Sequence, residues 1–377
     1  MFLEQIPAEY TFLFVLYGGS AFTALIACLY LCLRKGNAIA PDTTPPMSLR
    51  RWAAALFGFA FLSHVWWLLF FVFSNDLYSV FLLVVAVIDN VALLISIGGS
   101  LFAMLQDRKR QVWPLAVAMI PYAALLTLNV IFPKDFFLHL AIVYLMFVFL
   151  LFSIYMVFAV RQYKHWLHDN YADLEHKEVW VSHVLILIVL LLLTFDEIDG
   201  VSLTISYIVR IIEFPLFFFL VWRVETLPRL EAVPVESQPV ESQLVESQPM
   251  EQATQLQKSM TISSNIEKLL EERCVAEKLY LQHDLSLLQL AQAVGTNRFY
   301  LSQYFSRQGI TYNAYINNLR INHFMRLYHE TVAAQRSVAA QQLAHESGYR
   351  SYSTFSLAFK QRTGQSVTAW MRHPQDA

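Results

Sequence analysis

Two stretches near the end of the sequence share the same pattern. In each, small and apolar residues at fixed spacing are followed by polar residues. In the first stretch Ala291 precedes Gly295 by four residues, and Leu301 and Phe305 follow at helical spacing. A small residue lets two helices pack closely, and glycine allows the tight turn between them. We therefore expect a second helix anchored by Leu301 and Phe305, with its polar face free to donate hydrogen bonds to a ligand.

The second stretch repeats the pattern with a turn one residue longer. Ala344 precedes Gly348, Phe355 and Phe359 are the expected anchors, and Ser351 is the expected N-cap of the second helix. One such pattern is weak evidence, but the two are 53 residues apart and are joined by a helical pattern over 312–328. Together they predict paired helix-turn-helix motifs.

The charge balance of this region suits a polyanionic partner. From Lys258 to the end, 13 Lys and Arg stand against 8 Asp and Glu, whereas the whole chain has a formal net charge of −2. A basic domain in a weakly acidic chain is typical of nucleic-acid binding, although many solvated domains are mildly basic.

Residues 266–372 resemble the DNA-binding domain of the AraC family of bacterial transcription regulators. The residues of the second motif that match the family's signature are Gly348, Tyr349, Ser351, Phe355, Phe359, Lys360, Gly364 and Ser366. The resemblance implies seven helices, with each of two recognition helices entering the major groove on one face of the duplex, about one helical turn apart.

The resemblance also carries over the family's DNA-contacting positions. Its base-reading positions correspond to Arg298, Phe299, Ser302 and Gln303 in the first motif and to Ser353, Thr354 and Leu357 in the second. We expect phosphate contacts from Arg298, Arg350, Lys360 and Arg362, which position a protein without specifying sequence. Phe299 is equally compatible with packing. Leu357 replaces a common Arg, which favours contact with a thymine methyl group.

A second group of chemically capable residues lies within apolar stretches. Asp89, Arg210 and Glu213 are expected at comparable depth, with Arg210 and Glu213 on one helix face at i, i+3. His64 and Asn90 are candidates to join them. Charges in the membrane interior are costly and mark functional sites by default. We expect either structural pairing or a site for a ligand or proton, with Asp89, Arg210, Glu213 and His64 as the candidate sensing residues.

Seven apolar stretches occupy the first 229 residues and explain why 56% of the chain is hydrophobic and its mean hydropathy is +0.43. They cover 10–33, 52–73, 77–105, 113–132, 136–160, 179–195 and 203–222. Each is close to the roughly 17–25 residues that cross about 30 Å of hydrocarbon as a helix. The sequence therefore predicts a seven-span membrane domain.

The connecting segments predict the orientation of that domain. Twelve Lys and Arg fall in the first, third and fifth connections and after the last stretch, whereas the other side has only Lys134 against seven acidic residues. By the positive-inside rule the N-terminus is outside and the C-terminus is cytoplasmic. An odd number of spans is consistent with that result.

A polar segment follows the last apolar stretch. Residues 231–252 read EAVPVESQPVESQLVESQPMEQ, with a five-residue repeat rich in Pro, Ser, Gln and Glu. Such a composition cannot bury a core and favours an extended, disordered tether. We expect residues 230–260 to be a flexible linker.

The sequence offers no pattern for catalysis. Cys28, Cys32 and Cys274 form no CxxC pair, and we expect neither a metal site nor a disulfide. The His, Ser and acidic residues lack the spacing of a nucleophile with its base. We expect no cofactor and no enzyme activity.

These observations predict an all-α protein: a seven-helix transmembrane bundle (1–229), a disordered linker (230–260) and a tandem helix-turn-helix domain (261–373). The expected function is a membrane-anchored, sequence-specific transcription regulator of the bacterial inner membrane, with the bundle as sensor or anchor. The expected partners are double-stranded DNA, the lipid bilayer, a small-molecule signal, RNA polymerase and a second copy of the chain. The alternative is a membrane receptor or transporter whose C-terminal domain binds protein.

Overall fold

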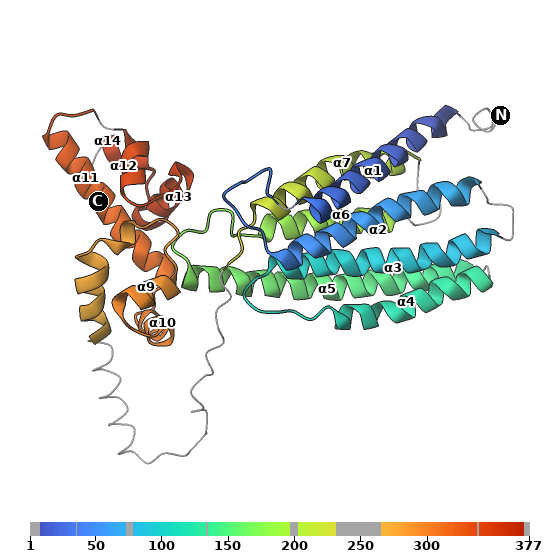
Figure 1. Ribbon diagram of the computed structural model, residues 1–377, viewed down its shortest axis with the longest axis horizontal. Coiled ribbons are helices and arrows are strands. Elements are labelled where there is room, and N and C mark those ends of the chain that lie inside the picture. The colour runs from blue at the N-terminus through green and yellow to red at the C-terminus, as the bar shows by residue number, and fades with distance from the viewer. Residues whose placement is uncertain are drawn as a thin grey trace, which may run out of the picture. The chain divides into compact units, whose positions relative to one another are not determined.

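The computed structural model describes residues 8–34, 36–72, 78–132, 135–196, 203–230, 265–337 and 339–372. The described residues are mostly helical and form no strand. The chain divides into two compact units (Figure 1), one comprising 1–163 and 179–232, the other 164–178 and 233–377. The predicted linker lies almost wholly outside the described residues.

Seven long helices make up the described part of the first unit. They are α1 (Ala8–Leu33), α2 (Met47–Val72), α3 (Tyr78–Met104), α4 (Trp113–Ile131), α5 (Asp135–Asn170), α6 (Trp180–Asp196) and α7 (Leu203–Thr226). α1 packs against α2 and α7, α2 against α3, α3 against α4, and α6 against α7. Each of the seven predicted stretches therefore corresponds to a helix.

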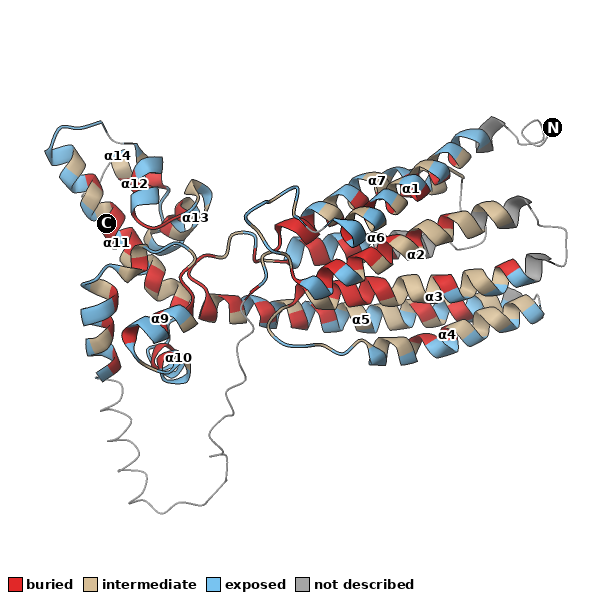
Figure 2. Cartoon of the chain, in the orientation of Figure 1, coloured by how far each residue is buried: buried red, intermediate tan, exposed pale blue. Residues whose placement is uncertain are grey.

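The outer surfaces of these helices remain apolar. Figure 2 shows exposed positions along α4 and α5, and large side chains such as Phe136, Phe147 and Phe158 are more than half exposed. Water disfavours an apolar surface of this extent, whereas hydrocarbon accepts it. Five of the helices, α1, α3, α4, α5 and α7, are long and apolar enough to cross a membrane. α6 has only 17 residues, at the lower end of the spanning range.

The end of α5 corrects one predicted boundary. The apolar stretch ends near Val160, but the helix continues through Arg161 to Asn170. The added turns are polar and aromatic, and they still bury Tyr163, Leu167 and Asn170. Loss of hydropathy therefore marked the end of the apolar segment and not the end of the helix.

Apart from one long helix, the C-terminal part of the second unit is built from short helices. After a helical stretch at 265–269 come η2 (Leu270–Val275), η3 (Leu279–Leu281), α9 (Leu287–Val294), α10 (Arg298–Arg307), α11 (Tyr312–Ala333), α12 (Ala340–Glu346), α13 (Tyr352–Thr363) and α14 (Val367–Arg372). One core forms around α9, α10 and the start of α11. A second forms around the rest of α11 with α12, α13 and α14. The long helix α11 thus contributes to both cores.

Candidate nucleic-acid interface

The first motif consists of α9 and α10. Ser286 caps α9 by accepting a hydrogen bond from the Gln289 backbone N–H, while the Gln289 side chain accepts one from the Ser286 backbone. Gly295 ends the helix at φ 77°, a left-handed conformation that favours glycine. Asn297 then caps α10. The expected anchors Leu301 and Phe305 are buried, which confirms the predicted packing.

The second motif consists of α12 and α13 and has the same logic. The Ser351 side chain accepts a hydrogen bond from the Thr354 backbone N–H, so the predicted N-cap is confirmed. Phe355 and Phe359 are fully buried and pack against Phe324 of α11, with ring centroids 4.5 and 5.8 Å away. Both second helices are therefore fixed by aromatic or aliphatic anchors on one face.

The opposite faces of α10 and α13 carry most of the predicted base-reading residues. Phe299 is 52% exposed and Leu357 is 61% exposed. The other exposed candidates are Ser302, Gln303 and Ser353. Arg298 and Thr354 are only partly exposed, because other side chains cover them. α10 and α13 therefore each have an exposed face that carries predicted base-reading residues.

The predicted phosphate-contacting residues differ in their surroundings. Lys360 is exposed. Arg362 donates hydrogen bonds to the Asn318 carbonyl (2.7 Å) and the Asn322 side chain (2.6 Å), both on α11. Arg350 forms an ion pair with Asp284 at 3.0 Å. The two arginines therefore make contacts inside the unit.

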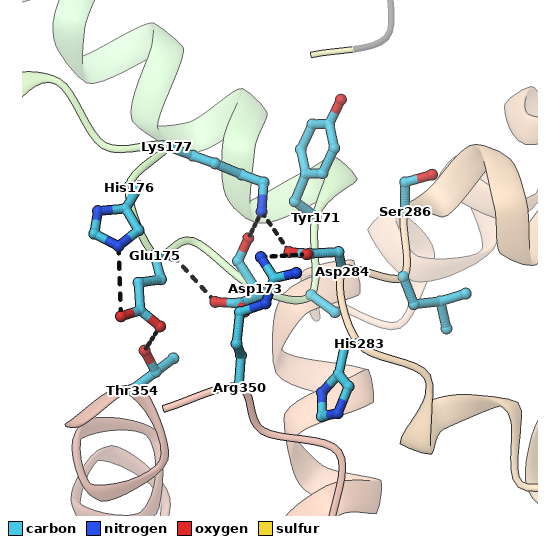
Figure 3. A network of polar contacts seen from close by, with 12 residues as sticks. Tyr171, Asp173, Glu175, His176, Lys177, His283, Asp284, Ser286, Arg350 and Thr354 are labelled. Atoms are coloured by element: carbon cyan, nitrogen blue, oxygen red, sulfur yellow. Dashed lines mark hydrogen bonds and ion pairs between the residues drawn. The ribbon is translucent and has the colours of Figure 1, made fainter. Parts of the chain in front are cut away.

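The connection between α5 and α6 belongs to the second unit and packs on its C-terminal part (Figure 3). Ala172 is buried in the core of the first motif, and its backbone N–H donates to the Leu285 carbonyl at 3.2 Å. Tyr171 and Ser286 form an isolated antiparallel bridge. The Asn313 side chain donates to the carbonyls of Tyr171 (3.1 Å) and Ala172 (2.8 Å). We call residues 170–177 the docking segment.

Two side chains of the docking segment reach α10 and α13. The Asn170 side-chain oxygen accepts a hydrogen bond from Arg298 at the start of α10. A Glu175 carboxylate oxygen accepts one from the Thr354 hydroxyl at the start of α13, at 3.3 Å (Figure 3). These contacts account for the partial burial of two predicted DNA-contacting residues.

Asp284 joins the docking segment to both motifs. One of its carboxylate oxygens lies 3.0 Å from Lys177 Nζ and the other 3.0 Å from Arg350 Nη1. Burial alone would raise the pKa of Asp284, but Lys177, by charge and hydrogen bond, and then Arg350 lower it below its ordinary value. Asp284 is therefore held as a carboxylate between two cations.

The candidate sensing residues are partly brought together. Glu213 accepts a hydrogen bond from Arg210 at 2.7 Å and lies 3.2 Å from His64 Nε2, and all three side chains are buried. Asp89 is also buried, but its carboxylate has no hydrogen-bond partner among the described residues. The expected network therefore forms without a direct bond to Asp89.

A cavity of about 130 Å³ lies beside this cluster. Its lining includes His64, Asn90, Arg210 and Glu213 at polar positions, and the remainder is largely leucine and isoleucine from α2, α3, α5, α6 and α7. Asn90 is further held by the Tyr122 hydroxyl at 3.3 Å. The cavity thus combines an apolar wall with one polar region.

Several residues that organise the interface were not foreseen from the sequence. They are Asn170, Glu175, Lys177, Asp284 and Asn313. Lys177 and Asp284 are 107 residues apart, and nothing in periodicity or motif spacing pairs residues at that separation. The basic and acidic residues of the fifth connection were informative only about topology.

Comparison with known families agrees with this geometry. Residues 290–373 match a family model described as a helix-turn-helix domain, of the AraC type, a family of DNA-binding regulators. No curated protein and no solved structure matches the chain. The match begins within α9 and ends beyond α14, so it includes both motifs. The second unit therefore contains an AraC-type helix-turn-helix domain, the DNA-binding part of a transcription regulator.

Proposed function

We propose that the chain is a membrane-anchored transcription regulator that binds specific DNA sequences through α10 and α13. One observation carries the proposal: two recognition helices have buried anchors around a common helix, α11, and exposed outer faces. A single long helix fixes the separation of the two faces, as binding to successive major grooves requires. The residues proposed to contact DNA are those predicted from the sequence.

The membrane part of the proposal rests on composition and outward-facing apolar side chains. Five helices have the length and hydropathy of spans, and α2 and α6 complete the seven crossings that we propose. The charge distribution of the connections favours an outer N-terminus and a cytoplasmic C-terminus, in the bacterial inner membrane. A reporter enzyme fused after Arg229 should then be active in the cytoplasm, and one fused at Asp199 in the periplasm.

We also propose that the bundle senses a small molecule. The cavity beside Arg210, Glu213 and His64 fits a compact ligand with an apolar body and one hydrogen-bonding group. Its polar residues come from α2, α3 and α7, so a ligand there would alter the packing of three helices together. RNA polymerase and a second copy of the chain remain proposed partners.

A DNA selection with the full chain tests the central claim. The protein in lipid nanodiscs is mixed with a random duplex library, and bound DNA is sequenced after several rounds. We expect one enriched motif with two conserved blocks about one helical turn apart. If neither the wild type nor the variants described below enrich a motif, that result contradicts DNA binding. Protein capture would then favour the alternative, a receptor whose C-terminal domain binds protein.

A further inference from the structure

We propose that the docking segment, residues 170–177, competes with DNA for the recognition helices and so restrains the regulator. This inference rests on the proposed function, because it concerns the same DNA-contacting faces. It adds an interaction surface on the connection between α5 and α6, whose partner is the C-terminal part of the same unit (265–372), called the DNA-reading unit below.

The docking segment is held by its backbone as well as its side chains. Both carbonyls of Tyr171 and Ala172 accept hydrogen bonds from Asn313, and the Ala172 N–H is bonded to Leu285. Ala172 and Tyr171 are 2% and 8% exposed. A surface loop in passing contact would not bury its main chain in this way, so the segment occupies a formed site on the unit.

The contacts at the ends of the segment use groups that DNA would also use. Arg298 donates to Asn170, and Thr354 donates to the carboxylate of Glu175. Base-edge acceptors and phosphate oxygens are bound by the same two kinds of donor. While Glu175 holds the Thr354 hydroxyl, that hydroxyl cannot donate to a base.

The charge of the docking segment also opposes DNA binding. Residues 164–178 contain four acidic residues, Asp169, Asp173, Glu175 and Glu178, and two lysines. Lys177 is already paired with Asp284. A docked segment therefore adds net negative charge to the unit, and Glu175 brings a carboxylate to the first turn of α13, where it repels an approaching phosphate.

The covalent connection gives this competition a link to the membrane. The segment begins at the last residue of α5 and leads into α6. Both helices line the cavity beside Arg210 and Glu213. A ligand that changes how α5 and α6 pack would change the position or strain of the segment and release the recognition helices.

Two substitutions test the competition in the full chain. Glu175→Ala removes the acceptor for Thr354, and Asn170→Ala removes the acceptor for Arg298. We expect each to tighten binding to the selected duplex by roughly threefold to tenfold, the effect of one net hydrogen bond. The matched control for Glu175→Ala is Asp169→Ala, which removes the same charge from a side chain that lies 3.9 Å from His165. We expect it to change affinity less than twofold.

Hydrogen exchange on the wild-type chain gives a test that needs no variant. Adding the selected duplex should accelerate exchange of the amides at 171–177, because DNA displaces the segment. Unchanged exchange at 171–177 in the DNA complex, or equal or weaker DNA binding by both Glu175→Ala and Asn170→Ala, would overturn the competition. Either result is distinct from failure of the proposed function, in which no duplex is enriched at all.

Discussion

The guanidinium carbon of Arg320 lies 5.4 Å from the ring centre of Tyr349, and this contact joins α11 to the turn of the second motif. Arg320 is 1% exposed and belongs to α11, while Tyr349 lies in the turn before α13. The same guanidinium donates to the carbonyls of Tyr280 and Gln282, both at 2.7 Å. One buried cation therefore fixes α11, the chain around η3 and the second motif together.

Replacing this cation should destabilise the DNA-reading unit. Arg320→Met leaves two carbonyls without their donor, and each buried unsatisfied group costs about 1–3 kcal/mol. We expect a loss of roughly 2–4 kcal/mol in the free energy of unfolding, measured by urea-dependent pulse proteolysis of the full chain. Arg326→Met, on the same helix but with an exposed ion pair to Glu330, is the control, and we expect a loss of about 0–1 kcal/mol. Equal losses would contradict the bridging role.

The surroundings of Gly348, at the same junction, lead to a second prediction. A Cβ atom there would lie 2.8 Å from the Leu281 Cα and carbonyl oxygen, and φ is 89°. Gly364 also has a positive φ, 75°, but an added Cβ meets no atom within 4 Å. Gly364→Ala should cost only the backbone penalty, about 1–2 kcal/mol, and Gly348→Ala at least about 1 kcal/mol more. Urea titration of both variants measures the difference, and equal costs would show that the backbone at Leu281 adjusts freely.

Local patterns predicted the elements of the DNA-reading unit well. Gly295, Gly348 and the Ser351 cap determine turns within a few residues of themselves, so their effect is readable from sequence. The apolar stretches likewise predicted the seven helices of the first unit, because length and hydropathy are local properties. The exception is the end of α5, where amphipathic residues continue the helix beyond the apolar segment.

Contacts between distant segments could not be predicted in this way. Asn170 and Arg298 are 128 residues apart, and Glu175 and Thr354 are 179 apart. Each pair depends on where the connection between α5 and α6 packs within the second unit, which no periodicity encodes. The sequence placed Asp89, Arg210 and Glu213 at comparable depth, yet the missing bond to Asp89 depends on side-chain geometry.

Asp284 should make attachment of the docking segment dependent on pH. Because its folded pKa is lowered, the stabilisation is fully present above the unfolded value of about 3.9 and is lost as the pH falls through the folded pKa. We expect protection of amides 171–177 to fall below about pH 4, after correction for intrinsic exchange rates. Asp284→Asn keeps the size and tolerates the left-handed backbone at φ 55°, and should lower protection at neutral pH. A variant with wild-type protection and pH dependence would contradict this assignment.

The buried Arg210–Glu213 pair should be costly to break and tolerable to replace. Arg210→Met or Glu213→Gln alone leaves one buried charge without its opposite, at about 3–5 kcal/mol. The double variant removes both charges and should recover most of that loss. Thermal unfolding of the four proteins in nanodiscs forms a double-mutant cycle. Additive losses in the double variant would contradict direct coupling between the two side chains.

Substitution of Gln303 should change the DNA sequence preference, whereas substitution of Lys360 should change the overall affinity for DNA. Gln303 is an exposed amide on α10 that can donate to and accept from one base, so Gln303→Ala should relax preference at one or two positions by roughly 1–3 kcal/mol. Lys360 is an exposed cation on α13, and Lys360→Ala should weaken all duplexes alike and reduce the salt dependence of binding. Repeating the library selection with each variant, and measuring affinity at several salt concentrations, distinguishes the two effects. An unchanged motif with Gln303→Ala would exclude base reading at that position, and an altered motif with Lys360→Ala would mean that Lys360 contacts a base.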